Sequence, residues 1–145
     1  MRLALDEAHR AIETDDVPVG AVVIAGDGQV IAQAANQRQA TGDPLAHAEI
    51  LALHQAAQAR GNWRLDDCTM VVTLEPCAMC AGAIAQARMQ RLVFGAYDPK
   101  AGAVSSLFDL LRDPRLPHRV EVIPGVLEEA CQTVLTDFFA HKRQT

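Results

Sequence analysis

Two short motifs constrain this chain more than any other feature, because their side chains can share one metal ion. The first is His47-Ala48-Glu49 and the second is Pro76-Cys77-Ala78-Met79-Cys80, with twenty-six residues between them. Cys77 and Cys80 are three residues apart, so at the start of a helix their sulfur atoms lie on one face. A fold that uses both motifs must bring His47 to the start of the helix that carries the cysteines.

The donor set of these motifs favours zinc. Two thiolates and an imidazole suit zinc better than calcium or magnesium, and we expect His47, Cys77 and Cys80 to hold one Zn²⁺ per chain. Three protein ligands leave a fourth position open for water, which is the arrangement of a catalytic site. The alternative is that Cys68 completes a closed structural site; otherwise Cys68 and Cys131 are inert core thiols.

Glu49 is the residue that separates an enzyme from a structural zinc protein. Zinc lowers the pKa of its bound water to about 7, and a nearby carboxylate can take that proton and pass it on. Residues two apart on a regular helix point about 200° apart. His47 and Glu49 can therefore serve one site only from the first turn of a helix, approached end-on. A zinc-stabilised RNA-binding or scaffold protein would not need this carboxylate, so an enzyme is favoured.

The pattern of apolar residues predicts an α/β fold in one domain, residues 1–145. We expect a single mixed five-stranded sheet with helices on both faces, in three α/β/α layers. Helices are predicted at residues 2–14, 46–59, 76–88, 105–111 and 126–142, and strands at 19–24, 30–35, 69–73, 91–95 and 119–123. The first two strands form a predicted hairpin. The last two are expected to be parallel because a helix joins them.

Composition limits the possible partners. Half of the residues are hydrophobic and 21% are charged, which excludes a disordered chain. The net charge of −5 excludes a general nucleic-acid coat protein, so RNA binding needs a local basic patch. Residues 88–119 hold six Arg and Lys against three acids, and Lys142 and Arg143 follow Phe138 and Phe139 in the last part of the sequence. The first fifteen residues do not have the pattern of a signal peptide, and the longest apolar run, Val17–Ala25, is too short to cross a membrane. We therefore expect a cytoplasmic protein without a membrane partner.

Longer stretches of the chain resemble one known family. HAE and PCAMC are similar to the signature of the zinc-dependent cytidine-deaminase-like superfamily. DPLAHAEILAL, TLEPCAMCAGAIAQARMQRLVFGAYDPKAGAVSSLFDLL, HRVEVIPGVLEEA and DFFAHKRQ resemble the tRNA-specific adenosine deaminases within it. This likeness runs from residue 2 to the end of the chain.

The resemblance implies a reaction and a set of site residues. It implies hydrolytic deamination of adenosine to inosine at the wobble position of a tRNA anticodon, by a zinc-activated water with Glu49 as proton shuttle. His47, Cys77 and Cys80 would be the zinc ligands, and Asn36 would hydrogen-bond the substrate base. Phe139 is the first candidate for stacking on a base of the anticodon loop. The family is homodimeric, and DNA is not an expected partner. The alternative is a deaminase of a free nucleobase or nucleotide, cytosine or guanine, within the same superfamily.

Overall fold

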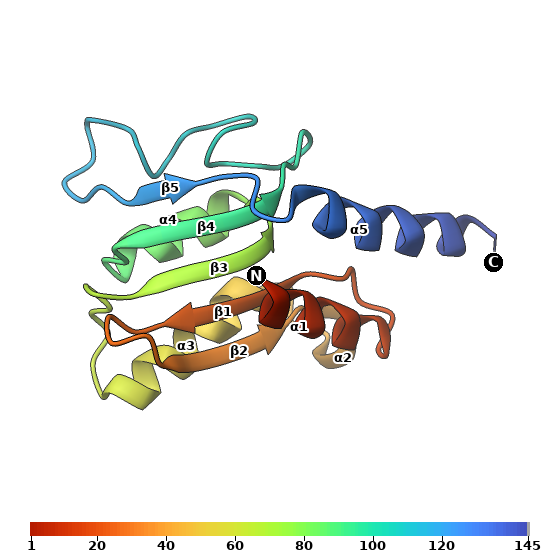
Figure 1. Ribbon diagram of the computed structural model, residues 1–145, viewed down its shortest axis with the longest axis horizontal. Coiled ribbons are helices and arrows are strands. Elements are labelled where there is room, and N and C mark those ends of the chain that lie inside the picture. Colours follow the sequence, from red (N-terminus) through yellow and green to blue (C-terminus); the bar gives the residue numbers. More distant parts are fainter. Residues whose placement is uncertain (145) are drawn as a thin grey trace.

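The computed structural model describes residues 1–144, and a five-stranded sheet forms its centre (Figure 1). The strand order is β2-β1-β3-β4-β5. β1 pairs antiparallel with β2 and β3, whereas β3, β4 and β5 run parallel. The predicted mixed sheet and its hairpin are therefore confirmed. The strands are β1 (Gly20–Ile24), β2 (Val30–Ala35), β3 (Thr69–Leu74), β4 (Arg91–Ala96) and β5 (Glu121–Ile123).

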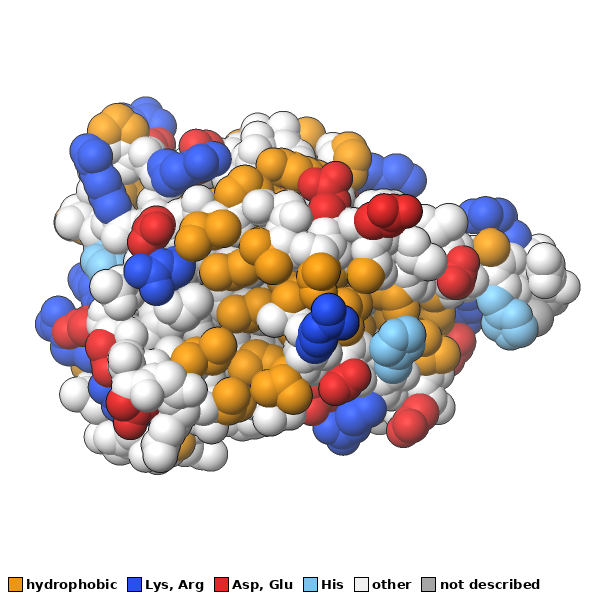
Figure 2. Space-filling view, in the orientation of Figure 1, with side chains coloured by type: hydrophobic (Ala, Val, Ile, Leu, Met, Phe, Trp, Pro, Cys, Tyr) orange, Lys and Arg blue, Asp and Glu red, His pale blue; other side chains and the backbone are white. Residues whose placement is uncertain are grey.

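Helices cover both faces of this sheet, as predicted. α1 (Arg2–Ile12) and α5 (Glu128–Arg143) contact each other on one face, while α3 (Ala48–Arg60) and α4 (Ala78–Gln86) pack together on the other. A single turn, α2 (Arg38–Thr41), follows β2 and was not predicted from the sequence. Figure 2 shows hydrophobic side chains along the middle of the face that carries α1 and α5, with charged side chains around them.

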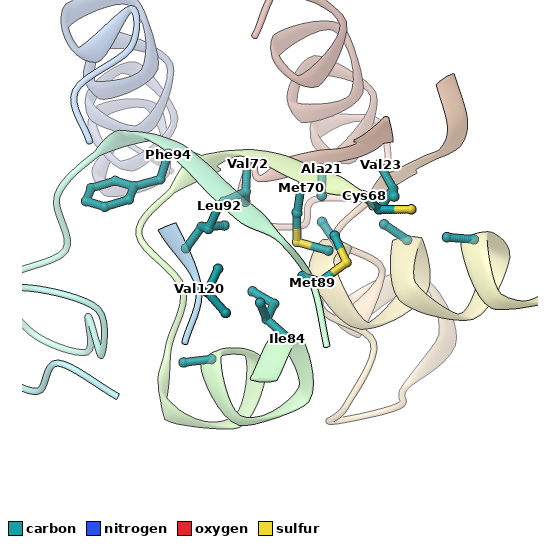
Figure 3. Packing of buried hydrophobic residues seen from close by; sticks show 14 of the residues in the cluster. Ala21, Val23, Cys68, Met70, Val72, Ile84, Met89, Leu92, Phe94 and Val120 are labelled. Carbon is teal, nitrogen blue, oxygen red and sulfur yellow. The ribbon is translucent and has the colours of Figure 1, made fainter. Parts of the chain in front are cut away.

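Successive side chains of the central strand β3 point to opposite faces of the sheet, so the core has two layers. Met70 and Val72 of β3 are buried with Ile84 of α4, and Figure 3 shows them between the sheet and the helices below it. Val71, between them in sequence, packs with Ala4 of α1 on the opposite face. This period of two is what a strand buried on both faces requires. The alanines of α3 on its buried side let that helix lie close to the sheet.

The connection between β4 and β5 differs from the prediction. The helix expected at residues 105–111 is absent: this segment has turns and an isolated bridge between Val104 and Asp109. Its backbone groups are bound elsewhere, because the N–H groups of Val104 and Ser106 donate to Glu75 and the Val104 carbonyl accepts from Arg112. β4 and β5 are parallel as predicted, but an irregular segment makes the crossover.

Two helix boundaries also differ from the prediction. α4 begins at Ala78 rather than at Pro76, because the backbone of Cys77 is still extended. α3 begins at Ala48, after an extended His47. Within residues 1–144, no helix combines the length and the apolar character that crossing a bilayer requires.

Candidate active site

The starts of α3 and α4 bring the two sequence motifs together. His47 is the N-cap residue of α3 and Cys77 is the N-cap residue of α4. Neither side chain makes a capping hydrogen bond at the start of its own helix. Because the two helices pack side by side, these side chains can instead point into one shared space. The requirement that both motifs open helices is confirmed.

His47, Cys77 and Cys80 form a compact group of metal-binding atoms. The Nδ1 atom of His47 lies 3.4 Å from the Cys80 sulfur and 3.7 Å from the Cys77 sulfur. All three donor atoms lie within 4.8 Å of one another. One ion at about 2.0–2.3 Å from each donor could be held at this spacing. Among the residues that the structure describes, this is the single group of three or more His, Cys, Asp or Glu side chains with such geometry.

Cys68 does not belong to this group, so the alternative of a closed four-ligand site is wrong. Cys68 precedes β3, whereas Cys77 follows that strand at its other end. The Cys68 sulfur accepts a hydrogen bond from Arg60 at 3.2 Å. Burial raises the pKa of the Cys68 thiol to about 11 and that of Cys131 to the same value, so both are inert core thiols as predicted.

The two clustered cysteines shift each other's pKa in opposite directions. A hydrogen bond from the Cys80 thiol lowers the pKa of Cys77 to about 3, and the same interaction raises the pKa of Cys80. The hydrogen bond with Cys77 also raises the pKa of His47. An ion held by both sulfur atoms would need both of them as thiolates, so its binding would release a proton from this pair.

Glu49 lies beside the cluster in the first turn of α3. Its side chain is buried, with 4% of the residue exposed, and burial raises its pKa to about 7. A carboxyl group with this pKa can hold or release a proton near neutral pH. The end-on placement that the spacing of His47 and Glu49 requires is thus present.

A cavity of about 220 Å³ opens onto these residues. Its volume suits a small planar group rather than a larger ligand. Polar groups and small apolar side chains share its walls. The lining residues are Val17, Val19, Asn36, Arg38, His47, Ala48, Glu49, Leu74, Glu75, Cys77, Asp98 and Ala101.

The amide of Asn36 is fixed in the wall of this cavity. Its Nδ2 atom donates to the Val17 carbonyl at 3.1 Å, and its Oδ1 atom accepts from the Arg38 N–H at 3.3 Å. An amide has one further N–H and one further lone pair, which remain for a ligand. Arg38, in the same wall, was missed by sequence reasoning. Its place two residues after Asn36 was the available signal.

Phe139 lies outside the cavity, in a groove of about 800 Å³ that joins it. The two spaces share Val17, Leu74, Asp98 and Ala101. The Phe139 ring is 44% exposed and packs edge-to-face on buried Phe138, with the ring centroids 5.3 Å apart. An exposed ring with a fixed orientation can stack on a planar partner.

Two of the basic residues that the sequence singled out border the groove. Of the six basic residues in 88–119, only Lys100 lines it, together with Arg143 at the end of α5. The others include three that pair with nearby acids. These pairs are Arg91 with Glu121, Arg112 with Asp109 and Arg115 with Asp113. Half of the six basic residues in 88–119 are therefore paired with acids, and among the six Lys100 alone lines the groove.

Comparison with known proteins agrees with this geometry. A family model described as MafB19-like deaminase matches residues 1–143. The tRNA-specific adenosine deaminase of Bacillus subtilis is 46% identical over 99% of this chain and 89% of its own length. The chain belongs to the tRNA-specific adenosine deaminase family. The enzyme of that name from Haemophilus influenzae is 45% identical over 99% of this deaminase and 83% of its own length.

Solved structures give the same result for the fold. A structure from a study of A-to-I editing by tRNA:A34 deaminases at the wobble position has a TM-score of 0.89 and 45% identity, over 93% of this deaminase and 97% of that chain. A guanine deaminase from Nitrosomonas europaea has a TM-score of 0.78 and 27% identity, over 94% of this deaminase and 81% of that chain. The cytidine-deaminase-like fold predicted from the sequence is confirmed.

Proposed function

We propose that this deaminase converts adenosine to inosine by hydrolysis at the wobble position of a tRNA anticodon loop. The observation that carries the proposal is the buried Glu49 beside one imidazole and two sulfur donors, at a cavity suited to one base. The names of the similar proteins supply the substrate class.

Zinc is the ion that the donor set fits best. One nitrogen and two sulfur donors suit zinc, and three protein ligands leave a position open. When bound, zinc supplies a Lewis acid that makes a water molecule nucleophilic near neutral pH. His47, Cys77 and Cys80 would hold one ion per chain.

Glu49 moves the protons of the reaction. Its carboxylate oxygen accepts a proton from the attacking water and delivers it to N1 of adenine. It then passes the second proton of that water to the amino group on C6, which leaves as ammonia. Adenosine and water thus give inosine and ammonia, with the carboxylate restored. Burial raises the pKa of Glu49 above that of an ordinary carboxyl group, which favours uptake of a proton from the water.

The walls of the cavity and the groove would hold the rest of the substrate. Asn36 offers an N–H and a lone pair to the base edge. Phe139 would stack on a neighbouring base, and Lys100 and Arg143 would contact phosphates. A loop base can enter such a cavity because it is already unpaired. Homodimer formation, a cytoplasmic location and the exclusion of DNA remain expectations from the family resemblance.

The test is inosine formation in a synthetic anticodon stem-loop with adenosine at the wobble position, followed by mass spectrometry. The proposal expects inosine at that position and little from free adenosine. A zinc-loaded, folded protein that makes no inosine would overturn it. Guanine and cytosine would then be the next substrates, because guanine deaminases share the fold.

A further inference from the structure

Glu75 is a buried carboxylate that the reaction above does not use. It is the last residue before Pro76 and Cys77, and 2% of it is exposed. Its four hydrogen bonds all come from a segment 23 to 31 residues further along the chain. Oε1 accepts from the Asp98 N–H at 3.0 Å and the Ser106 hydroxyl at 2.5 Å. Oε2 accepts from the Ser106 N–H at 2.8 Å and the Val104 N–H at 3.3 Å.

The segment 98–106 wraps closely around this carboxylate. Gly102 faces it so tightly that a Cβ atom there would lie 2.2–2.4 Å from the three carboxyl atoms of Glu75. The Ala103 N–H donates to the Pro76 carbonyl at 2.8 Å. Side-chain length at Glu75 and the missing side chain at Gly102 are therefore matched to each other.

This segment forms one wall of the substrate site. Asp98 and Ala101 line the cavity beside His47 and Glu49, and Lys100 lines the adjoining groove beside Phe139. Asp98 also folds the tip of the wall, because its Oδ1 atom accepts from the N–H groups of Lys100 and Ala101 at 3.1 and 3.2 Å. The hydrogen bonds of Glu75 thus reach the substrate site through Asp98.

We propose that Glu75 is a positioning residue that holds the 98–106 wall and so determines how tightly the RNA is gripped. The inference rests on the proposed function, since it assigns the wall to that substrate. All four donors around the carboxylate are N–H or O–H groups, so an ionised, acceptor-only side chain satisfies them. Glu75 has no role in proton transfer, because its oxygens are already occupied.

Glu75→Gln tests this role with little change in shape. The amide keeps one acceptor but turns an NH₂ group toward donors, so the wall loosens. We expect the stem-loop concentration for half-maximal rate to rise about tenfold, as for the loss of one or two such hydrogen bonds. The single-turnover rate constant at saturation should stay within about threefold of wild type, and zinc content should not change. Gly102→Ala changes the other partner of this contact, so it should also raise the half-maximal stem-loop concentration and leave the saturated rate constant nearly unchanged. Ser106→Ala should raise that concentration by less.

A second readout needs no catalysis. Trypsin cleaves after Lys100 when the wall opens, so Glu75→Gln and Gly102→Ala should be cut there several times faster than wild type. Asp113→Asn is the matched control: that carboxylate bonds to Arg115 in the same connection but lines neither the cavity nor the groove. It should leave both readouts unchanged.

The outcomes separate the two proposals. The positioning role would be overturned if Glu75→Gln had the same half-maximal stem-loop concentration as wild type and were cleaved by trypsin at the same rate. A fall in zinc content or in the saturated rate constant would also overturn it, by placing Glu75 in support of the metal cluster instead. If Glu75→Gln does not fold, Ser106→Ala and Gly102→Ala decide by the same criteria. If Glu75→Gln and Gly102→Ala are cleaved faster at Lys100 but the wild type makes no inosine, Glu75 does hold the 98–106 wall and the proposed reaction is wrong.

Discussion

The metal cluster and the wall beside it are built in opposite ways. His47, Cys77 and Cys80 lie at the starts of two helices, so their spacing in sequence already sets their directions. The 98–106 wall has no helix or strand of its own and depends on a carboxylate at the end of β3. The residues proposed for the chemistry are thus held by helix starts, whereas one wall of the proposed substrate site is held by hydrogen bonds to a single carboxylate.

The largest effect is expected at Glu49, the proposed proton shuttle. Glu49→Gln keeps the shape of the side chain but removes its ability to accept a proton, so the rate constant should fall by about 10²–10⁴-fold. Zinc content should match that of wild type, because Glu49 is not one of the clustered donors. Inosine formation under single turnover measures the rate. Glu129→Gln, an exposed change in the first turn of α5, is the control. Turnover near wild type would remove Glu49 from the mechanism.

Loss of a cluster sulfur should remove the ion as well as the activity. Cys77→Ala leaves one thiolate and one imidazole, which make a poor zinc site. We expect metal analysis of the purified variant to find well under one zinc per chain, and its melting temperature to fall. Cys68→Ala also removes a buried thiol, but one outside the cluster, and should keep its zinc. Equal zinc content in the two variants would show that Cys77 is not a ligand.

The cluster of His47, Cys77 and Cys80 could be predicted from the sequence, whereas the structure of the 98–106 wall could not. The cluster was predictable because each motif acts within one turn of one helix. The parallel pairing of β4 and β5 was predictable too, since any long crossover allows it. The helix expected at 105–111 was wrong because the backbone of Val104 and Ser106 is bound by Glu75, a partner 29 to 31 residues away. Local propensity carries no signal for a contact of that range.

The opposite wall of the cavity gives an intermediate test. Asn36→Ala removes the amide proposed to bind the base, along with its bonds to Val17 and Arg38. We expect about a tenfold rise in the stem-loop concentration for half-maximal rate, with unchanged zinc content. Asn36→Asp keeps the acceptor for the Arg38 N–H but loses the amide donor, so it should bind the stem-loop as poorly as Asn36→Ala while folding better. If both variants bind the stem-loop as tightly as wild type, Asn36 only stabilises the local backbone through its bonds to Val17 and Arg38.

The smallest effect is expected at Asp113, a partly exposed carboxylate in the β4–β5 connection. Hydrogen bonds from the Arg115 side chain lower the pKa of Asp113 to about 2 from its usual 3.8. Because the folded pKa is lower, this group stabilises the fold above about pH 4, and the contribution is lost as the pH falls through about 2. Asp113→Asn should therefore unfold at slightly lower urea concentration than wild type at neutral pH, and the gap should narrow below about pH 4. Salt should shrink the same gap, since Arg115 is exposed. If the difference between Asp113→Asn and wild type does not change with pH or with salt, packing rather than charge stabilises this turn.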